Sequence, residues 1–198
     1  MMSPQALTGL VLAGGRGRRL GGRDKGLVSL NGAPLVSHAM RALSDHVAEL
    51  LVSANRNLDD YQALGVRVVR DADADYPGPL AGLLAGLEAA TTPWLVVVPC
   101  DAPLLPPSLV PRLVNGIADA DIAVAHDGER LHPVIALMRT TLAPDLAQYL
   151  ASGEHKVRDW YQRQRWVAVD FSDCREAFAN LNTEQDRCRI EARLTEAS

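Results

Sequence analysis

Residues 8–25 read TGLVLAGGRGRRLGGRDK, a short apolar run followed by a loop with four arginines, one lysine and five glycines. The apolar run predicts a buried strand. Glycines let the backbone after it approach a ligand closely, so that successive N–H groups can point at phosphate oxygens. Basic side chains in the same loop add charge-assisted contacts. The stretch therefore predicts a strand that ends in a binding loop for a polyphosphate.

Positive charge is concentrated in this loop. The chain carries 20 Lys and Arg against 24 Asp and Glu, a formal net charge of −4. Without the five basic residues of the loop, the balance is 15 positive to 24 negative charges, or −9. A protein that binds nucleic acid along its surface carries a broad basic face. The composition therefore predicts no nucleic-acid partner.

Length, apolar runs and cysteines limit the class of protein further. A chain of 198 residues with 47% hydrophobic content predicts one globular domain over residues 1–198. Its longest apolar runs, such as WLVVV at 94–98, are far shorter than the roughly 18 residues of a membrane span. Three cysteines without CxxC spacing indicate neither a disulfide framework nor a zinc site. We expect a cytoplasmic protein without a membrane partner, and a monomer.

Strand and helix patterns alternate along the chain. Apolar runs predict strands over residues 9–13, 49–54, 66–70, 94–99, 122–125, 134–138 and 166–171. Three- and four-residue apolar spacing predicts helices over residues 34–44, 80–90, 109–117, 142–150, 156–164 and 183–194. The alternation predicts an α/β fold of the Rossmann-like, three-layer αβα type, with a mostly parallel sheet. Because no helix separates the fifth and sixth strands, one strand is expected to run antiparallel.

Polar residues follow the predicted strands at their carboxyl ends, where ligands gather in such sheets. The glycine loop follows the first strand, Ser53 and Asn55 end or follow the second, Asp71 follows the third, and Asp101 follows the fourth. The sequence therefore predicts one ligand site at this edge of the sheet.

Two common phosphate-binding fingerprints do not fit the loop. A GxGxxG pattern that starts at Gly15 has Leu20 in place of its last glycine. A GxxxxGK[ST] pattern is missing, because Lys25 follows an aspartate and precedes Gly26. The stretch LAGGRGRRLGGRDK at 12–25 instead resembles the signature loop of nucleotidyltransferases that activate sugar phosphates and related molecules with an NTP.

Four further stretches resemble the molybdenum cofactor guanylyltransferase (MobA) family: DYPGPLAG at 75–82, PCDAP at 99–103, HDGER at 126–130 and FANLNT at 178–183. The resemblance runs from about residue 8 to the C-terminal helix. It implies the nucleotidyltransferase fold and transfer of GMP from GTP to the phosphate of molybdenum-bound molybdopterin. Pyrophosphate would leave, and the guanine dinucleotide cofactor would form.

The same resemblance implies roles for the residues around the loop. It places the nucleotide against Leu12, Ala13 and Gly14, and the backbone N–H groups from Leu12 to Gly15 are expected to bind its phosphates. Lys25 would neutralise charge on the transferring phosphate, with support from Arg19. It assigns Mg²⁺ to Asp101, and Mg²⁺ prefers one or two carboxylates together with substrate phosphates.

Base and pterin recognition are implied in the same way. Asp71 would accept from the guanine N–H donors or contact the ribose. Some members of the family have asparagine at the position of Ser53, so here either the serine hydroxyl or Asn55 could make that contact. Gly82, in the GPLAG turn, would let the chain pass close to the ligand, or would simply pack a helix.

The family's pterin site includes Asn180 and Asn182, which could otherwise be turn residues before a helix. A role of His132 with the second substrate is weighed against a structural histidine, which we favour. Cys100 beside Asp101 is expected to be a small buried residue.

Three alternatives to the guanylyltransferase stay open. A cytidylyltransferase on the same pterin or a sugar-phosphate nucleotidyltransferase would keep the fold. A GTP-binding module without turnover is a different class, although a P-loop GTPase needs a GK[ST] and an NKxD motif, and both are missing. The partners expected for the leading reading are GTP and molybdenum-bound molybdopterin, with cofactor chaperones or acceptor enzymes beyond them.

Overall fold

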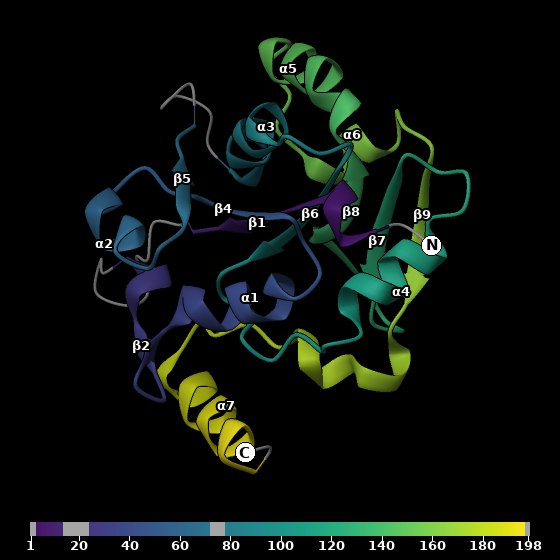
Figure 1. Cartoon of the computed structure of the whole chain (residues 1–198). Coiled ribbons are helices and arrows are strands. Elements are labelled where there is room, and N and C mark those ends of the chain that lie inside the picture. The colour runs from purple at the N-terminus through teal and green to yellow at the C-terminus, as the bar shows by residue number, and fades with distance from the viewer. Residues whose placement is uncertain (1–2, 14–23, 72–77, 197–198) are drawn as a thin grey trace.

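Seven strands form the central sheet of the computed structural model, which describes residues 3–13, 24–71 and 78–196. The strand order is β5-β4-β1-β6-β8-β7-β9 (Figure 1). The strands are β1 (Leu7–Leu12), β4 (Glu49–Ser53), β5 (Arg67–Val69), β6 (Trp94–Pro99), β7 (Ile122–His126), β8 (Leu131–Arg139) and β9 (Trp166–Asp170).

One strand runs against the others, as expected. β8 pairs antiparallel with both β6 and β7, whereas the remaining pairs in the sheet are parallel. The link between β7 and β8 is too short for a crossover helix, and Gly128 in it has a φ of 92°. A short link of this kind permits only an antiparallel hairpin.

Helices cover both faces of the sheet, which gives the expected three layers (Figure 1). On one face lie α1 (Leu35–Ser44) and α4 (Leu109–Gly116), and on the other lie α3 (Pro79–Ala89), α5 (Ala143–Ala151) and α6 (Val157–Tyr161). The short helix α2 (Leu58–Gln62) packs beside β5.

The alternating direction of the side chains along the buried strands explains why helices cover both faces of the sheet. In β6, Val96 and Val98 belong to the core beneath α1 and α4, whereas Leu95 and Val97 belong to the core beneath α3 and α5. Successive side chains of a strand point to opposite faces, so a continuous apolar run needs helices on both sides.

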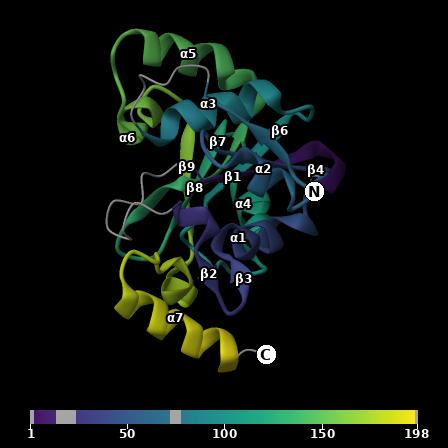
Figure 2. The ribbon, with the colours of Figure 1, turned by 90° about the vertical axis from the view of Figure 1, so that its left-hand side faces the viewer.

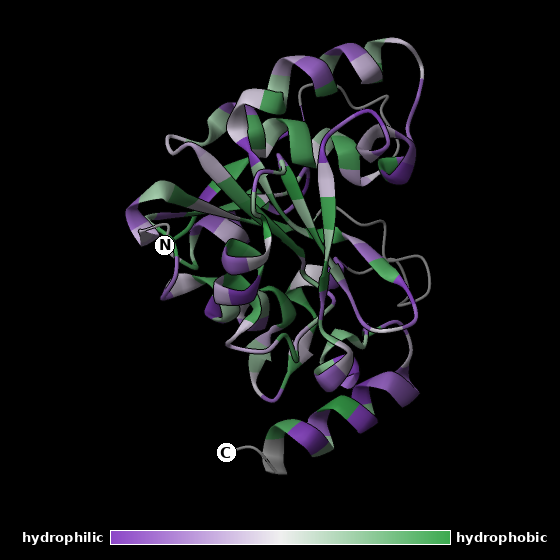
Figure 3. Cartoon of the chain, turned by 90° about the vertical axis from the view of Figure 1, so that its right-hand side faces the viewer, coloured by the Kyte–Doolittle hydropathy of each residue, from purple (hydrophilic) through white to green (hydrophobic). Residues whose placement is uncertain are grey.

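A smaller unit packs against α1. The hairpin of β2 (Ser29–Leu30) and β3 (Ala33–Pro34) turns at Asn31 and Gly32, whose φ angles are 47° and 77°, and α7 (Glu184–Glu196) lies near it (Figure 2). Leu30, Leu35, Leu181 and Ile190 form a separate apolar cluster there. Figure 3 shows α7 mostly hydrophilic with an interrupted apolar stripe, whereas the sheet strands are largely apolar. One apolar stripe is enough to hold a surface helix.

Most predicted elements are present with ends shifted by one to three residues. The helix predicted over 156–164 is an exception, because α6 covers only Val157–Tyr161 before the chain turns. The hairpin, α2 and the 3₁₀ turns were not predicted; the turns are Pro4–Ala6, Lys25–Leu27, Thr140–Leu142 and Ser172–Phe178. Every helix in the part of the chain that the structure describes is too short or too polar to span a bilayer.

Candidate active site at the carboxyl edge of the sheet

The carboxyl ends of four parallel strands lie level with one another. Leu12 pairs with Ser53 on one side and with Pro99 on the other, and Ser53 pairs with Val69. The N–H of Ala13 donates to the carbonyl oxygen of Ser53 at 2.9 Å. The residues that follow these four strands therefore emerge together, as the sequence predicted.

Lys25 and Asp101 meet at this edge. Nζ of Lys25 lies 2.7 Å from Oδ2 of Asp101 and 2.8 Å from Oδ1 of Asn182, and it donates to both. The side chains of Lys25 and Asp101 are 14% and 20% exposed, so the pair is only partly screened by water. The N–H of Leu181 donates to the backbone carbonyl of Asp101 at 2.8 Å, which ties the C-terminal segment to the same point.

The second oxygen of Asp101 is suited to a cation. Oδ1 is buried and has no hydrogen-bond partner among the described residues. A buried carboxylate oxygen without a partner is costly, so it marks a place where a ligand is expected. No group of three or more metal-binding side chains occurs in residues 3–13, 24–71 and 78–196. Mg²⁺ can be bound by one or two protein carboxylates together with phosphates and water, so Asp101 is a side chain that could hold it.

A second group of side chains lies at the ends of β4 and β5. Asp71 accepts from Oγ of Ser53 at 3.2 Å and from Nδ2 of Asn55 at 2.8 Å, while its own N–H donates to Oδ1 of Asn55 at 3.1 Å. Ser53 and Asn55 therefore both hold the Asp71 carboxylate. Which of the two contacts the nucleotide stays a prediction.

Gly82 packs closely against Ser53 and Asp71 of this group. It lies in the first turn of α3, which begins at Pro79, and so within the helix predicted over residues 80–90. A Cβ atom at this position would lie 2.5 Å from Oγ of Ser53 and 3.3 Å from Oδ1 of Asp71. Glycine here is a packing residue that lets the helix approach the site side chains.

Comparison with known proteins agrees with this geometry. Residues 9–169 match the model of the MobA-like NTP transferase domain. The molybdenum cofactor guanylyltransferase of Burkholderia ambifaria is 51% identical over 90% of this chain and 92% of its own. That of Shewanella loihica is 44% identical over 96% and 97%. The chain belongs to the molybdenum cofactor guanylyltransferase family.

A solved structure supports the fold of this family member. The molybdopterin-guanine dinucleotide biosynthesis protein A of Archaeoglobus fulgidus superposes with a TM-score of 0.78 over 96% of this chain and 99% of its own. Its sequence is 23% identical, so the likeness concerns the fold.

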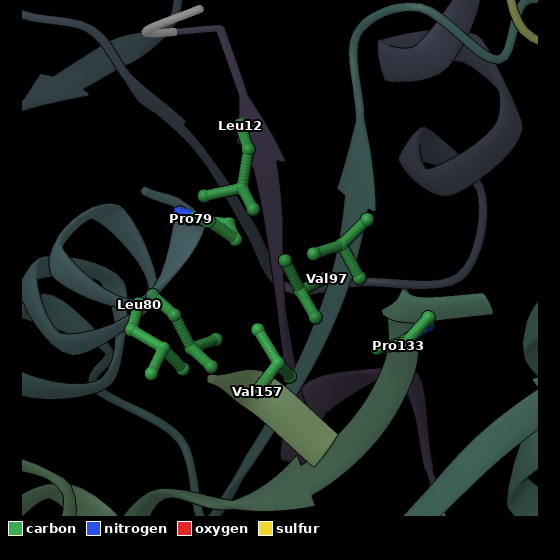
Figure 4. A pocket seen from close by; sticks show the side chains of 8 residues that line it. Leu12, Pro79, Leu80, Val97, Pro133 and Val157 are labelled. Carbon is green, nitrogen blue, oxygen red and sulfur yellow. The ribbon is translucent and has the colours of Figure 1, made fainter. Parts of the chain in front are cut away.

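An apolar hollow lies beside the site in this guanylyltransferase-family chain. Leu12, Pro79, Leu80, Val97, Pro133 and Val157 point into it from β1, α3, β6, β8 and α6 (Figure 4). Its lining is aliphatic, and the space between these side chains is too narrow to admit a water molecule. Aliphatic side chains can pack against the face of a ring but offer no donor to phosphate. The hollow is thus a neighbour of the polar site and not its phosphate-binding part.

His132 and Cys100 have structural surroundings. Nε2 of His132 lies 2.8 Å from Oδ2 of Asp127, and its ring stacks at 4.8 Å on Phe178. Burial lowers the pKa of His132 although Asp127 opposes this. Cys100 is 5% exposed, and burial together with the charge of Asp101 raises the pKa of its thiol to about 12. Both residues are buried, which agrees with their interpretation as packed residues.

Not every predicted site residue can be placed. Gly14, Gly15 and Arg19 lie outside the described residues, as do the acidic residues after Asp71. Asn180 is half-buried two residues before Asn182. The side chain of Asn182 accepts from Lys25 and its backbone N–H donates to Asp186, and the pterin-binding role of both asparagines stays a prediction.

Sequence reasoning missed three residues near Lys25. Asp24 accepts from Oη of Tyr61 at 2.6 Å and from Nδ2 of Asn57 at 3.0 Å. The position of Asp24 directly before the lysine was a signal that could have found it, whereas nothing local connects Tyr61 or Asn57 to the loop.

Proposed function

We propose that the protein transfers GMP from GTP to the phosphate of molybdenum-bound molybdopterin, with release of pyrophosphate. An oxygen of the acceptor phosphate forms a bond to the α-phosphorus of GTP, and the bond from that phosphorus to the bridging oxygen breaks. The electron pair leaves with pyrophosphate. The observation that carries this proposal is the Lys25–Asp101 pair at the carboxyl edge of the sheet, where Oδ1 of Asp101 has no partner among the residues that the structure describes.

The chain's own residues contribute mainly charge and position. The acceptor phosphate is already anionic near neutral pH, so the reaction needs no side-chain base. Two polyanions must approach each other, and a preorganised cation lowers that barrier. Lys25 is held by Asp101 and Asn182 and would contact the transferring phosphate.

Asp101 would hold Mg²⁺ through Oδ1. When bound, Mg²⁺ would neutralise charge on the phosphates of the nucleotide. Lys25 occupies the other oxygen of the same carboxylate, so one side chain would orient both cations.

Asp71 would recognise guanine or ribose. Each of its carboxylate oxygens accepts one hydrogen bond from Ser53 or Asn55 and keeps capacity for another. The guanine N1–H and N2–H₂ donors match a carboxylate fixed in this way. Asn180 and Asn182 would contact the pterin.

Compartment and partners follow from the same proposal. Cys100, Cys174 and Cys188 are all free thiols, which suits a reducing cytoplasm. We further propose that the protein acts as a monomer and passes its product to cofactor chaperones or acceptor enzymes.

Pyrophosphate release tests the proposal directly. It is measured with each of the four NTPs and Mg²⁺, with and without molybdenum-bound molybdopterin. We expect release only with GTP and only with the acceptor. Release with CTP, or with a sugar 1-phosphate as acceptor, would assign a different nucleotidyltransferase. Binding of GTP without release under any condition would assign a module without turnover.

A further inference from the structure

The carboxylate of Asp24 accepts hydrogen bonds from three donors. Oδ1 accepts from Oη of Tyr61 at 2.6 Å and from the N–H of Gly26 at 3.2 Å, and Oδ2 accepts from Nδ2 of Asn57 at 3.0 Å. Tyr61 is fully buried in α2, and Asn57 precedes that helix. Through these hydrogen bonds, Asp24 holds the backbone next to Lys25 against α2.

The residue after Lys25 packs against the same hydroxyl. A Cβ atom on Gly26 would lie only 2.4 Å from Oη of Tyr61. The glycine therefore lets the backbone pack directly against the tyrosine. Burial, together with the hydrogen bond to Asp24, raises the pKa of Tyr61, so the hydroxyl stays protonated and remains a donor.

Lys25 stands between these two anchored neighbours. Its side chain extends from the anchored backbone to Asp101 and Asn182. A free lysine has high rotamer entropy, and fixing its Cα removes part of the cost of holding Nζ at one point. The contacts of Asp24 and Gly26 therefore explain how Nζ of Lys25 can be held in one position although a glycine follows the lysine.

We propose that Tyr61 is a positioning residue for Lys25, acting through Asp24 and Gly26. Tyr61 does not touch the reacting groups; it sets the direction from which the lysine reaches the phosphates. The kinetic part of this inference rests on the proposed guanylyl transfer. The placement of the lysine does not, and it can be measured without substrate.

Lysine NMR measures that placement, because Lys25 and Lys156 are the two lysines of the chain. Protein labelled with ¹³C and ¹⁵N in lysine gives two side-chain signals, which Lys156→Arg assigns. Tyr61→Phe removes only the hydroxyl. We expect the Lys25 signal to shift or broaden and the Lys156 signal to stay in place.

Tyr149→Phe is the matched control. Tyr149 is also buried, and its hydroxyl donates to the backbone carbonyl of Lys156 at 3.1 Å. The same chemical change there should leave the Lys25 signal unchanged. If Tyr61→Phe does not fold, Asn57→Ala removes a different donor from Asp24 at an exposed position. An unchanged Lys25 signal in a folded variant at either position would overturn the inference.

A double-mutant cycle tests the kinetic part. We expect Tyr61→Phe to lower kcat about tenfold, because the amine of Lys25 would be slightly misplaced. The KM for GTP should change little. In the Lys25→Ala background the same substitution should change kcat less than about twofold, since the residue acts through Lys25. Equal losses in both backgrounds would show a general structural role and overturn the proposal. Absence of turnover by the unaltered protein would contradict the proposed function instead, and the NMR result would still decide the placement.

Discussion

Nζ of Lys25 lies 2.7 Å from Oδ2 of Asp101, although 76 positions of sequence separate the two residues. Lys25 follows the loop after β1, and Asp101 follows β6, which pairs with β1 in parallel register. The pairing brings both strand ends to one level, so the lysine charge is already oriented before substrate arrives. The other oxygen of Asp101 is buried and remains available to a cation.

Replacement of Asn182 should slow the reaction. Asn182→Ala removes the amide oxygen that accepts from Lys25, a hydrogen bond to a charged group. Such bonds contribute about 1.5–3 kcal/mol, so we expect kcat to fall at least about tenfold. Steady-state kinetics with saturating GTP measure it. Asn115→Ala, at an exposed position of α4, is the control and should not alter kcat. A variant at 182 with normal kcat would show that the Lys25 contact has no role in turnover.

Gly82→Ala should weaken nucleotide binding. The added methyl group meets Ser53 and Asp71, which would have to move apart. Overpacking of this kind costs about 1–3 kcal/mol, so the Kd for GTP should rise about tenfold. Calorimetry with GTP gives the value.

Gly86→Ala is the control for this substitution. It lies one turn further along α3, and its added methyl would meet the side chain of Leu10 in the core. It should lower the free energy of unfolding without changing the Kd for GTP. Equal Kd changes in both variants would contradict a specific role of position 82.

Stability should fall with acid in two steps. Burial lowers the pKa of His132, so the unfolded chain binds the proton more readily, and stability is lost as the pH falls below about 6.5. Hydrogen bonds from the N–H groups of Arg130 and Glu129, and from His132, lower the pKa of Asp127 against the effect of burial. That contribution is present above about pH 3.9 and is lost below it.

Urea unfolding between pH 3 and 8 measures both steps. His132→Gln should reduce the loss of unfolding free energy between pH 7 and 5. The remaining loss is due to His38, whose pKa is also lowered by burial. Asp127→Asn should reduce the acid step. A pH profile of His132→Gln that runs parallel to that of the unaltered protein would contradict the assignment.

The three cysteines should differ in reactivity. Cys188 is exposed and Cys174 is half-buried, whereas Cys100 is buried with its pKa raised to about 12. Because the thiolate is the reactive form, Cys188 should be alkylated first at pH 8 and Cys100 only after unfolding. Mass spectrometry of alkylated peptides over time checks the order. Rapid labelling of Cys100 in the folded protein would contradict its burial.

The fold could be predicted from the sequence because its strands are nearly continuous apolar runs. The run at 94–99 was predicted with its observed bounds, and the strand ends that position Asp71 and Asp101 followed from it and its neighbours. The helix α2 has only five residues, too few for a helical period to be recognised. The turn at Asn31 and Gly32 carried a usable hairpin signal.

The candidate site could be predicted only in part from the sequence. Residues at strand ends could be assigned to one edge, but contacts between distant segments could not. Lys25 and Asn182 are 157 positions apart, and Tyr61 and Asp24 are 37 apart. Apolar periodicity places a residue on an element and a face, yet it does not tell which polar side chains meet. Asn182 was therefore assigned to the pterin alone, and its bond to the lysine appears only in the fold.

The most direct test of the account is a comparison of Lys25→Ala, Asp101→Ala and the double variant, with Lys156→Ala as the control. GTP affinity and formation of the guanine dinucleotide product are measured for each in the presence of Mg²⁺. We expect each single variant to lose at least about a hundredfold in product formation, as when one preorganised charge is removed. The double variant should lose both product formation and most of its GTP affinity, while Lys156→Ala keeps both. Normal affinity and normal product formation by the double variant would contradict the central claim that this pair binds and activates the nucleotide.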